Sequence, residues 1–400
     1  MKKFILLLLS CAALAAPLSA QETIGEVNVS VNGQTLPVRV SANTPDLNAL
    51  ALQAFGVHGR YHVVASGYLY DIRFSLVSPT QVQVNVEKGP GGGSVVAEVV
   101  AGTSARNALL RAADVAVERT NGLGLHGFFA SKLACIGERT GHEEIYLGDL
   151  FFGNERQITN DRAIAMTPRW SPDGGKLIYT SYYHSGFPDI FVISLNANAS
   201  SFERTTFVSF RGTNSDAHFS PDGRRVAMVL SGEGTPEIYV SDAQGHMVSR
   251  KTHYDSTKAS PCWSPDGSRI VFVSEPGPQL YMISASGGGM QRLTFNISRY
   301  CAEPDWSRAN PDKIAFTMGT SGNHYQIAVY DFSKRASQQV SHAPFDGIEP
   351  VWLADGRHLV YTARNAYASR LCILDTVTGK STPISPTSFG PAKQGAVWSQ

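Results

Sequence analysis

The chain has 400 residues, enough for two domains, and its 42% hydrophobic and 17% charged residues exclude a disordered protein. Its formal net charge is +1, and loss of Lys2 and Lys3 would make it −1. A chain so close to neutrality, without a run of Lys or Arg, lacks the basic face that nucleic-acid binding requires.

Residues 1–20 have the pattern of a cleaved secretory signal. Lys2 and Lys3 precede a short apolar stretch, and small residues end the segment at Ala20. This predicts an envelope protein exported to the bacterial periplasm. A competing lipoprotein box, Leu-Leu-Ser-Cys, would lipidate Cys11 instead. We expect no later segment to enter a membrane, because none is apolar enough.

Residues 21–125 predict a small α+β domain. Alternating apolar residues indicate strands at 27–31 and 36–40, joined as a hairpin by Asn32-Gly33. Thr44-Pro45-Asp46 opens a helix that runs to Phe55, and a second, amphipathic helix is expected over 103–120. Further strands are expected at 60–66, 71–77, 81–86 and 94–100.

A repeated motif, Pro-x-Trp-Ser-Pro-Asp-Gly in its fullest copies, occupies residues 128–400 after a Gly-rich linker. Its aromatic anchors recur at intervals of 43 to 49 residues, at Trp170, Phe219, Trp263, Trp306, Trp352 and Trp398. Each motif supplies a turn between two short strands, and two more strands follow before the next copy. Four strands in such a period predict one blade of a β-propeller.

The first repeat lacks its innermost strand. Strands at 132–136, 144–149 and 155–159 have no Trp motif before them, whereas Trp398 has no strands after it. We therefore expect strand 395–399 at the C-terminus to complete the first blade, which gives six blades and closes the ring.

Four cysteines follow Cys11, and none has the Cys-x-x-Cys spacing of a zinc or redox site. Cys262 and Cys301 occupy nearly equivalent positions in successive repeats, so a disulfide between them is conceivable. Buried free thiols are the favoured alternative.

The motif repeats, the signal and the segments VERTNG at 117–122 and GFFASKLA at 127–134 together resemble the TolB family. The resemblance covers most of the mature chain but is poor in the first half of the small domain. It implies a non-enzymatic scaffold of the periplasmic Tol-Pal system, which supports outer-membrane integrity and constriction at cell division. We expect a monomer in the free state, without cofactor or metal.

The same resemblance implies two partners. A TolA-like inner-membrane protein would bind the segment after the signal, residues 21–29, including Glu22, Thr23 and Ile24. A peptidoglycan-associated lipoprotein resembling Pal would bind the mouth of the propeller channel. The alternative for residues 27–31 is a strand of the small domain itself. By motif, the lipoprotein-binding residues correspond to Thr213, Asn214, Asp216, Ala259, Ser260, Glu303 and Glu349.

The channel mouth also follows from the repeat itself. The residues near the start of each innermost strand should ring one end of the channel, namely 166–167, 215–216, 259–260, 302–303, 348–349 and 394–395. Three of these six pairs contain an acid, so a cation or a basic partner surface could be attracted. Arg169, His218 and Asp305 precede their anchors by one residue, and alternation predicts that they face the channel.

Two alternatives to a scaffold remain open: a propeller enzyme acting on a cell-wall or extracellular glycan, and a glycan-binding propeller. A serine peptidase is disfavoured because no Gly-x-Ser-x-Gly elbow occurs. A glycosidase using Glu303 and Glu349 depends on a carboxylate separation that sequence does not give. Exposed aromatic residues at 182–183 and 367 are candidate interface anchors.

Overall fold

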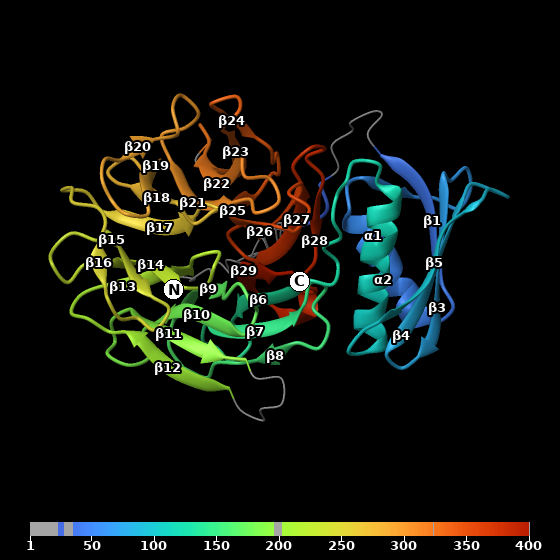
Figure 1. Cartoon of the computed structure of the whole chain (residues 1–400), viewed down its shortest axis with the longest axis horizontal. Coiled ribbons are helices and arrows are strands. Elements are labelled where there is room, and N and C mark those ends of the chain that lie inside the picture. Colours follow the sequence, from blue (N-terminus) through green and yellow to red (C-terminus); the bar gives the residue numbers. More distant parts are fainter. Residues whose placement is uncertain (1–22, 28–34, 196–201, 323, 400) are drawn as a thin grey trace, which may run out of the picture.

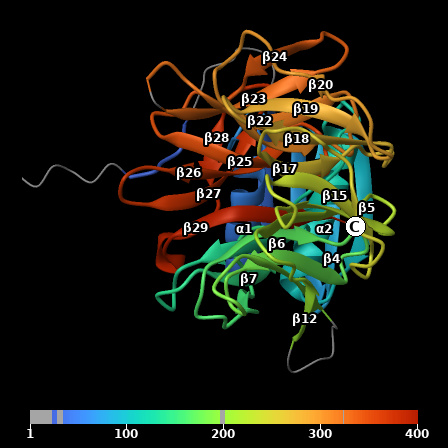
Figure 2. The same cartoon turned by 90° about the vertical axis from the view of Figure 1, so that its left-hand side faces the viewer.

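The computed structural model describes residues 23–27, 35–195, 202–322 and 324–399. A small α+β domain lies beside a six-bladed β-propeller, and Figure 1 shows the two parts next to each other. The blades are arranged around the ring in Figure 1, and Figure 2, turned by 90°, shows the propeller from the side with the small domain behind it.

The α+β domain is a five-stranded sheet, in the order β2-β1-β3-β4-β5, covered by two helices. Pro45 occupies the first turn of α1, and the Ser104 hydroxyl caps α2 by accepting a hydrogen bond from the amide of Asn107 at 3.2 Å. The helices bury Leu50, Phe55 and Leu109 against the sheet. The elements are β1 (Leu36–Ala42), α1 (Pro45–Val57), β2 (Tyr61–Val63), β3 (Tyr70–Ser78), β4 (Gln81–Lys88), β5 (Ser94–Ala101) and α2 (Ala105–Thr120).

The predicted hairpin between residues 27–31 and 36–40 is wrong. Strand β1 pairs in parallel with β2 on one side and with β3 on the other, so neither of its edges is free for another strand. Val27 instead forms an antiparallel bridge with Ser381 in the propeller. Residues 28–34, with the expected Asn32-Gly33 turn, lie outside the described residues.

Six four-stranded antiparallel sheets form the propeller, as the repeats predict. In five blades the four strands lie side by side in chain order. The first blade differs because its innermost strand comes from the C-terminus. The blades are, in order around the ring, β29 (Ala392–Trp398) with β6 (Lys132–Gly137), β7 (Glu144–Asp149) and β8 (Arg156–Gln157); β9 (Ala165–Trp170), β10 (Lys176–Ser181), β11 (Asp189–Ser194) and β12 (Glu203–Val208); β13 (Asn214–Phe219), β14 (Arg225–Leu230), β15 (Glu237–Asp242) and β16 (Ser249–Arg250); β17 (Lys258–Trp263), β18 (Arg269–Ser274), β19 (Gln279–Ser284) and β20 (Gln291–Arg292); β21 (Cys301–Trp306), β22 (Lys313–Gly319), β23 (Tyr325–Asp331) and β24 (Ala336–Gln339); β25 (Asp346–Trp352), β26 (His358–Arg364), β27 (Ser369–Asp375) and β28 (Ser381–Pro383).

The C-terminal strand closes the first blade. Strand β29 pairs antiparallel with β6, and Ala396 lies opposite Ala134. The indole of Trp170, in the second blade, donates a hydrogen bond to the Ala396 carbonyl at 3.0 Å. The first and last described strands of the propeller therefore share one sheet, in which β29 is the innermost strand and β6 has no free edge.

The aromatic anchors of the motif fill the spaces between adjacent blades. Trp170, Trp263, Trp306 and Trp352 are all nearly buried. The Trp263 indole reaches back to the His218 carbonyl at 2.9 Å, and the Trp352 indole to the Asp305 carbonyl at 3.0 Å. These two anchors thus combine apolar burial with an indole N–H that bonds to a neighbouring blade, whereas the Trp306 indole bonds within its own blade, to the Pro311 carbonyl at 2.7 Å.

Buried polar contacts join the two domains. The Gly59 amide donates a hydrogen bond to Nε2 of His358 at 3.1 Å. A Cβ at Gly59 would lie 1.8 Å from an oxygen of Asp375, so only glycine permits this close approach. Arg357 pairs with Asp375 at 2.6 Å on the propeller side and completes the buried network.

The four described cysteines, Cys135, Cys262, Cys301 and Cys372, are buried free thiols. The favoured expectation of unpaired cysteines is therefore confirmed, and no disulfide joins Cys262 to Cys301.

Removing residues 395–400 should destabilise the propeller strongly. The deletion takes away most of β29, exposes one edge of β6 and removes the carbonyl that the Trp170 indole uses. We expect the melting temperature to fall by roughly 5 °C or more, which corresponds to a loss of about 2 kcal/mol. Differential scanning calorimetry measures it, and a chain shortened by Gln400 alone is the control. Equal melting temperatures for the two truncations would contradict the role of β29 in closure.

Candidate functional site

The innermost strand of every blade contains a β-bulge at the same position. Its pairing with the second strand shifts register there, as between Met166 and Arg169 in β9. One non-glycine residue at each bulge adopts a positive φ of 51° to 57°; these residues are Thr167, Asp216, Ser260, Glu303, Glu349 and Gln394.

Positive φ is unfavourable for side chains with a Cβ and costs on the order of 1–3 kcal/mol per residue. The positive φ recurs here because each β-bulge turns its side chain out of the regular alternation of the strand. In this ring all six side chains are brought to one end of the channel, where they line a cavity of about 190 Å³. Six repetitions of the same strain indicate that the arrangement is specified by the fold.

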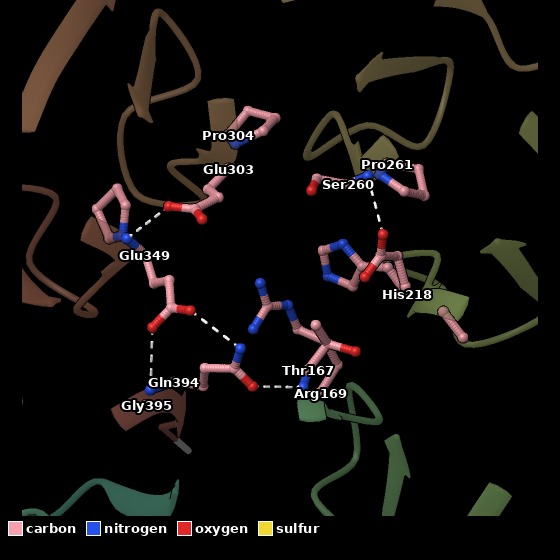
Figure 3. Close-up of a pocket in the computed structure, with 13 residues that line it drawn as sticks. Thr167, Arg169, His218, Ser260, Pro261, Glu303, Pro304, Glu349, Gln394 and Gly395 are labelled. Carbon is pink, nitrogen blue, oxygen red and sulfur yellow. Dashed lines mark hydrogen bonds between the residues drawn. The ribbon is translucent and has the colours of Figure 1, made fainter. Parts of the chain in front are cut away.

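Hydrogen bonds run around the ring from blade to blade. The Ser260 amide donates to Asp216 Oδ2 at 3.3 Å, and the Glu349 amide donates to Glu303 Oε2 at 2.9 Å. The Thr167 amide donates to Gln394 Oε1 at 2.7 Å, and Gln394 Nε2 donates to Glu349 Oε1 at 2.9 Å. Figure 3 shows these links along the wall of the cavity. The ring side chains therefore hold adjacent blades together as well as facing the cavity.

Arg169 enters the middle of this cavity, as the alternation along β9 predicts. Figure 3 shows its side chain directed between Glu349 and Gln394 on one side and His218 on the other. Its guanidinium donates a hydrogen bond to the Pro168 carbonyl at 3.2 Å. The mouth therefore presents acceptors around its rim and a cation at its floor.

Burial perturbs the acids of the ring. Desolvation raises the pKa of Asp216. Desolvation, with a smaller contribution from the charge of nearby Glu349, raises the pKa of Glu303 to about 7. The mouth is thus less negative near neutral pH than three ionised carboxylates would make it.

The structure brings together four of the seven channel-mouth residues that the sequence assigns to the lipoprotein. Asp216, Ser260, Glu303 and Glu349 line the cavity. The other three lie outside its lining. Asn214 is fully buried and bonds to the Phe210 carbonyl at 2.8 Å, the Thr213 amide donates to Ser231, and Ala259 packs between blades. Their place in the predicted interface stays a prediction.

Two cavity residues, Thr167 and Gln394, have a place in the predicted ring but no predicted partner role. Their hydrogen bond to each other joins the first and second blades across the closure. For Thr167 the signal is positional, since it precedes its anchor by the same interval as the acids do in other repeats. Gln394 precedes Trp398 by one residue more, so the spacing of the C-terminal copy alone would misplace it.

The N-terminal segment lies against the outer strand of the sixth blade. Glu22 lies outside the described residues and Thr23 is exposed, whereas Ile24 is 3% exposed. The Ile24 carbonyl accepts a hydrogen bond from Arg370 at 3.1 Å, and the Val27 amide donates to the Ser381 carbonyl at 2.8 Å. Part of the predicted TolA-binding segment is thus docked on the propeller rather than on the small domain's sheet.

Large exposed side chains gather at the mouth end. The strands of each blade alternate in direction. Two loops of each blade therefore lie at the same end as the bulge residues: the loop before the innermost strand, and the loop between the second and third strands. Seven exposed apolar or aromatic residues lie in these loops, among them Phe187 at 66% and Phe295 at 61%; the others are Ile164, Tyr183, Phe210, Tyr254 and Tyr367. We call these seven the aromatic rim.

Among the described residues, one group has the composition of a metal site: His58, Asp355 and His358. Nδ1 of His358 is hydrogen-bonded to Asp355 at 2.5 Å, and its Nε2 accepts from the Gly59 amide. Both nitrogens of His358 are therefore in use, and the group is better explained as part of the domain interface. In the same described part of the chain, no helix combines the length and apolar character needed to cross a bilayer.

Glu303→Gln should stabilise the protein at alkaline pH. Unfolded Glu303 ionises near pH 4.5, whereas the folded carboxyl keeps its proton up to about pH 7. The contribution of Glu303 to the free energy of unfolding is therefore fully present below pH 4.5 and is lost as the pH rises through 7. We expect the variant to melt roughly 3 °C or more above the wild type at pH 8 and within about 1 °C of it at pH 5. Scanning calorimetry at both pH values checks this, and an equal difference at both would contradict it.

Comparisons with known proteins agree with this architecture. A family model described as the TolB beta propeller domain matches residues 122–400. A Protein TolB homolog from Chlorobium chlorochromatii is 34% identical over 151 residues, covering 38% of this chain and 33% of the relative. A Tol-Pal system protein TolB from Desulfosudis oleivorans is 36% identical over 129 residues, covering 32% of this chain and 28% of the relative. The matches thus span about a third of these relatives' length.

Solved structures extend the likeness to nearly the whole chain. TolB from Acinetobacter baumannii superimposes with a TM-score of 0.77 at 21% identity, covering 93% of this chain and 98% of the other. TolB from Agrobacterium tumefaciens, described as putative, gives a TM-score of 0.51 at 21% identity over 64% of this chain and 88% of the other. At these identities the structures establish the fold, and the family model carries the assignment: this chain belongs to the TolB β-propeller family.

Proposed function

We propose that this protein is a non-enzymatic scaffold of the Tol-Pal system in the periplasm. It would link a TolA-like inner-membrane protein to a Pal-like, peptidoglycan-associated lipoprotein, and so serve outer-membrane integrity and constriction at cell division. The observation that carries the proposal is the mouth end of the propeller, where a ring of hydrogen-bonding side chains is surrounded by the aromatic rim.

The chemistry of this end suits a protein partner. Exposed aromatic side chains are enriched at protein interfaces, and surface apolar groups gathered around a polar pocket are typical of a recognition site. Phe187 and Phe295 come from different blades, so a partner covering both would span the channel mouth. Its inserted residues would meet acceptors at the rim and the Arg169 guanidinium below them.

The carboxylates favour binding over catalysis. Glu303 accepts hydrogen bonds from the Glu349 amide and from the Thr317 hydroxyl at 2.6 Å. Glu349 accepts from the Thr362 hydroxyl at 2.7 Å and from Gln394. A general acid or nucleophile must be free to reach a substrate, whereas these groups are engaged between blades. The glycosidase alternative is therefore disfavoured.

The docked N-terminal segment suggests how the second partner would be reached. A strand-adding partner needs the backbone of residues 21–29, yet Val27 already pairs with Ser381 and Ile24 is buried. Binding would have to release these contacts, and burial of one Ile side chain alone is worth about 1.5–3 kcal/mol. The propeller surface would therefore compete with the partner for the same segment.

Replacing the rim residues Phe187 and Phe295 together by Ser should reduce capture of the Pal-like lipoprotein at least tenfold. Interface aromatic residues commonly contribute more than about 1 kcal/mol each. Immobilised mature protein, incubated with an envelope extract of its own source and read by mass spectrometry and immunoblot, measures the capture. Met247→Ser is the control, because Met247 is 85% exposed but lies in a loop at the opposite end. Equal capture by all forms, or retention and cleavage of a glycan instead of the lipoprotein, would contradict the proposal.

Deleting residues 21–29 should abolish capture of the TolA-like protein and leave capture of the Pal-like protein unchanged. The described part of this segment, residues 23–27, contacts the outer edge of the sixth blade through Val27 and is absent from the lining of the mouth cavity. The same capture assay reports both partners from one extract, so each serves as the control for the other. Loss of both partners together would show that the segment has a structural role, and retention of both would remove it from the interface.

A further inference from the structure

A second cavity lies at the opposite end of the propeller channel, distinct from the mouth. Its volume is about 340 Å³, and its walls include the six aromatic anchors and two motif prolines, Pro221 and Pro265. This size falls in the range of small-molecule sites, which are largely apolar with a few placed polar groups. The polar groups of this cavity determine which ligand it fits.

Two arginines, Arg169 and Arg308, line this cavity and are departures from the repeat. Arg169 stands where the other blades have histidine, cysteine, aspartate or, in two blades, valine. Arg308 stands where three other copies of the motif have proline. They belong to the second and fifth blades, three blades apart in a ring of six, so they approach the channel from opposite sides.

Neither guanidinium is in a direct salt bridge with the described part of the chain. Within it, no ion pair involves Arg169 or Arg308, and Arg169 bonds only to the Pro168 carbonyl. A guanidinium carries five N–H donors in a rigid fork suited to carboxylate or phosphate. The cavity therefore has more strong donors than its own acceptors satisfy.

Asp305 is the acid that lines this cavity, and it is already engaged; Asp216, at the mouth, also interacts with the charge of Arg169. Asp305 Oδ2 accepts the Trp352 amide at 2.8 Å, and Oδ1 faces the Cys262 thiol at 3.9 Å. Burial raises the pKa of Asp305, although the charge of Arg169 opposes the shift. Even fully ionised, Asp305 would be outnumbered by the two guanidiniums. The net charge of this end of the channel is positive.

The other titratable groups do not offset that charge. Burial lowers the pKa of His218 to about 3, with the charges of Arg169 and Arg308 adding to the effect, so this imidazole is neutral. Its Nδ1 is buried without a hydrogen-bond partner. Burial also raises the pKa of the Cys262 thiol, which stays protonated. His126, from the linker, adds a further nitrogen at the rim of the cavity.

We propose that this end of the channel binds a small organic anion, held by its carboxylate or phosphate group between Arg169 and Arg308 and by its flat apolar body against the tryptophan walls. The site shares Arg169 and His218 with the mouth cavity, whereas Arg308 belongs to this end alone. A metal cation is disfavoured here because two guanidiniums face a single carboxylate, Asp305, and would repel it.

Fluorine NMR of 4-fluorobenzoate with the mature protein tests the site, because bound ligand broadens its signal. The neutral 4-fluorobenzyl alcohol, of similar shape, reports apolar binding alone. Arg308→Gln and Arg169→Gln should each weaken benzoate binding roughly tenfold or more, since a charge-assisted hydrogen bond is lost. Arg224→Gln is the matched control, as Arg224 is exposed in a motif turn at the same end but outside the cavity.

The expected result is that wild type and Arg224→Gln bind benzoate in preference to the alcohol, while both test variants lose the preference. Arg308 lines only this cavity and is exposed, so its variant distinguishes the site from the mouth without disturbing the fold, which a melting curve verifies. Absence of benzoate binding by the wild type, equal binding of the alcohol, or undiminished binding by Arg308→Gln would each overturn the proposal.

Discussion

The pairing of β29 with β6 is the constraint on which the rest of the molecule depends. A propeller blade is stable only when both of its faces are covered by neighbours, and a linear array would leave two blades half exposed. Joining the C-terminal strand to the first blade turns the array into a ring, and the Trp170 indole fastens this composite blade to the next. The contact spans most of the chain, so the entropy lost in forming it is offset by contacts throughout the ring.

Ring closure also creates the channel and brings the bulges into register. Because each innermost strand has the same kink, six side chains meet at one end, and several of them reach an amide of the next blade. The strain of a positive φ is offset by these hydrogen bonds, and they form only when the neighbouring blades are present. The mouth is therefore a property of the closed ring, and an isolated blade could not have it.

The two ends of the channel differ in chemistry although the same repeat builds both. At the mouth, acceptors and exposed aromatic side chains predominate, which suits a folded protein partner. At the other end, tryptophan walls and two arginines line an open cavity, and we propose a small anion as its ligand. Arg169 contributes to both cavities, so occupation of one end would be felt electrostatically at the other.

Periodicity alone determined the propeller. The aromatic anchors and the Ser-Pro-Asp-Gly turns predict four strands per repeat, and the incomplete first repeat together with Trp398 predicts the shared blade, because local turn chemistry and strand alternation are encoded within a few residues. Alternation also placed Arg169 inside the channel. Only the tertiary structure decided that β1 has both edges occupied, that Val27 pairs with Ser381, and that Asn214 is buried while Asp216 faces the cavity. These outcomes depend on contacts between residues far apart in the chain, and on a bulge that reverses which side chains face inward, neither of which is written in the local pattern.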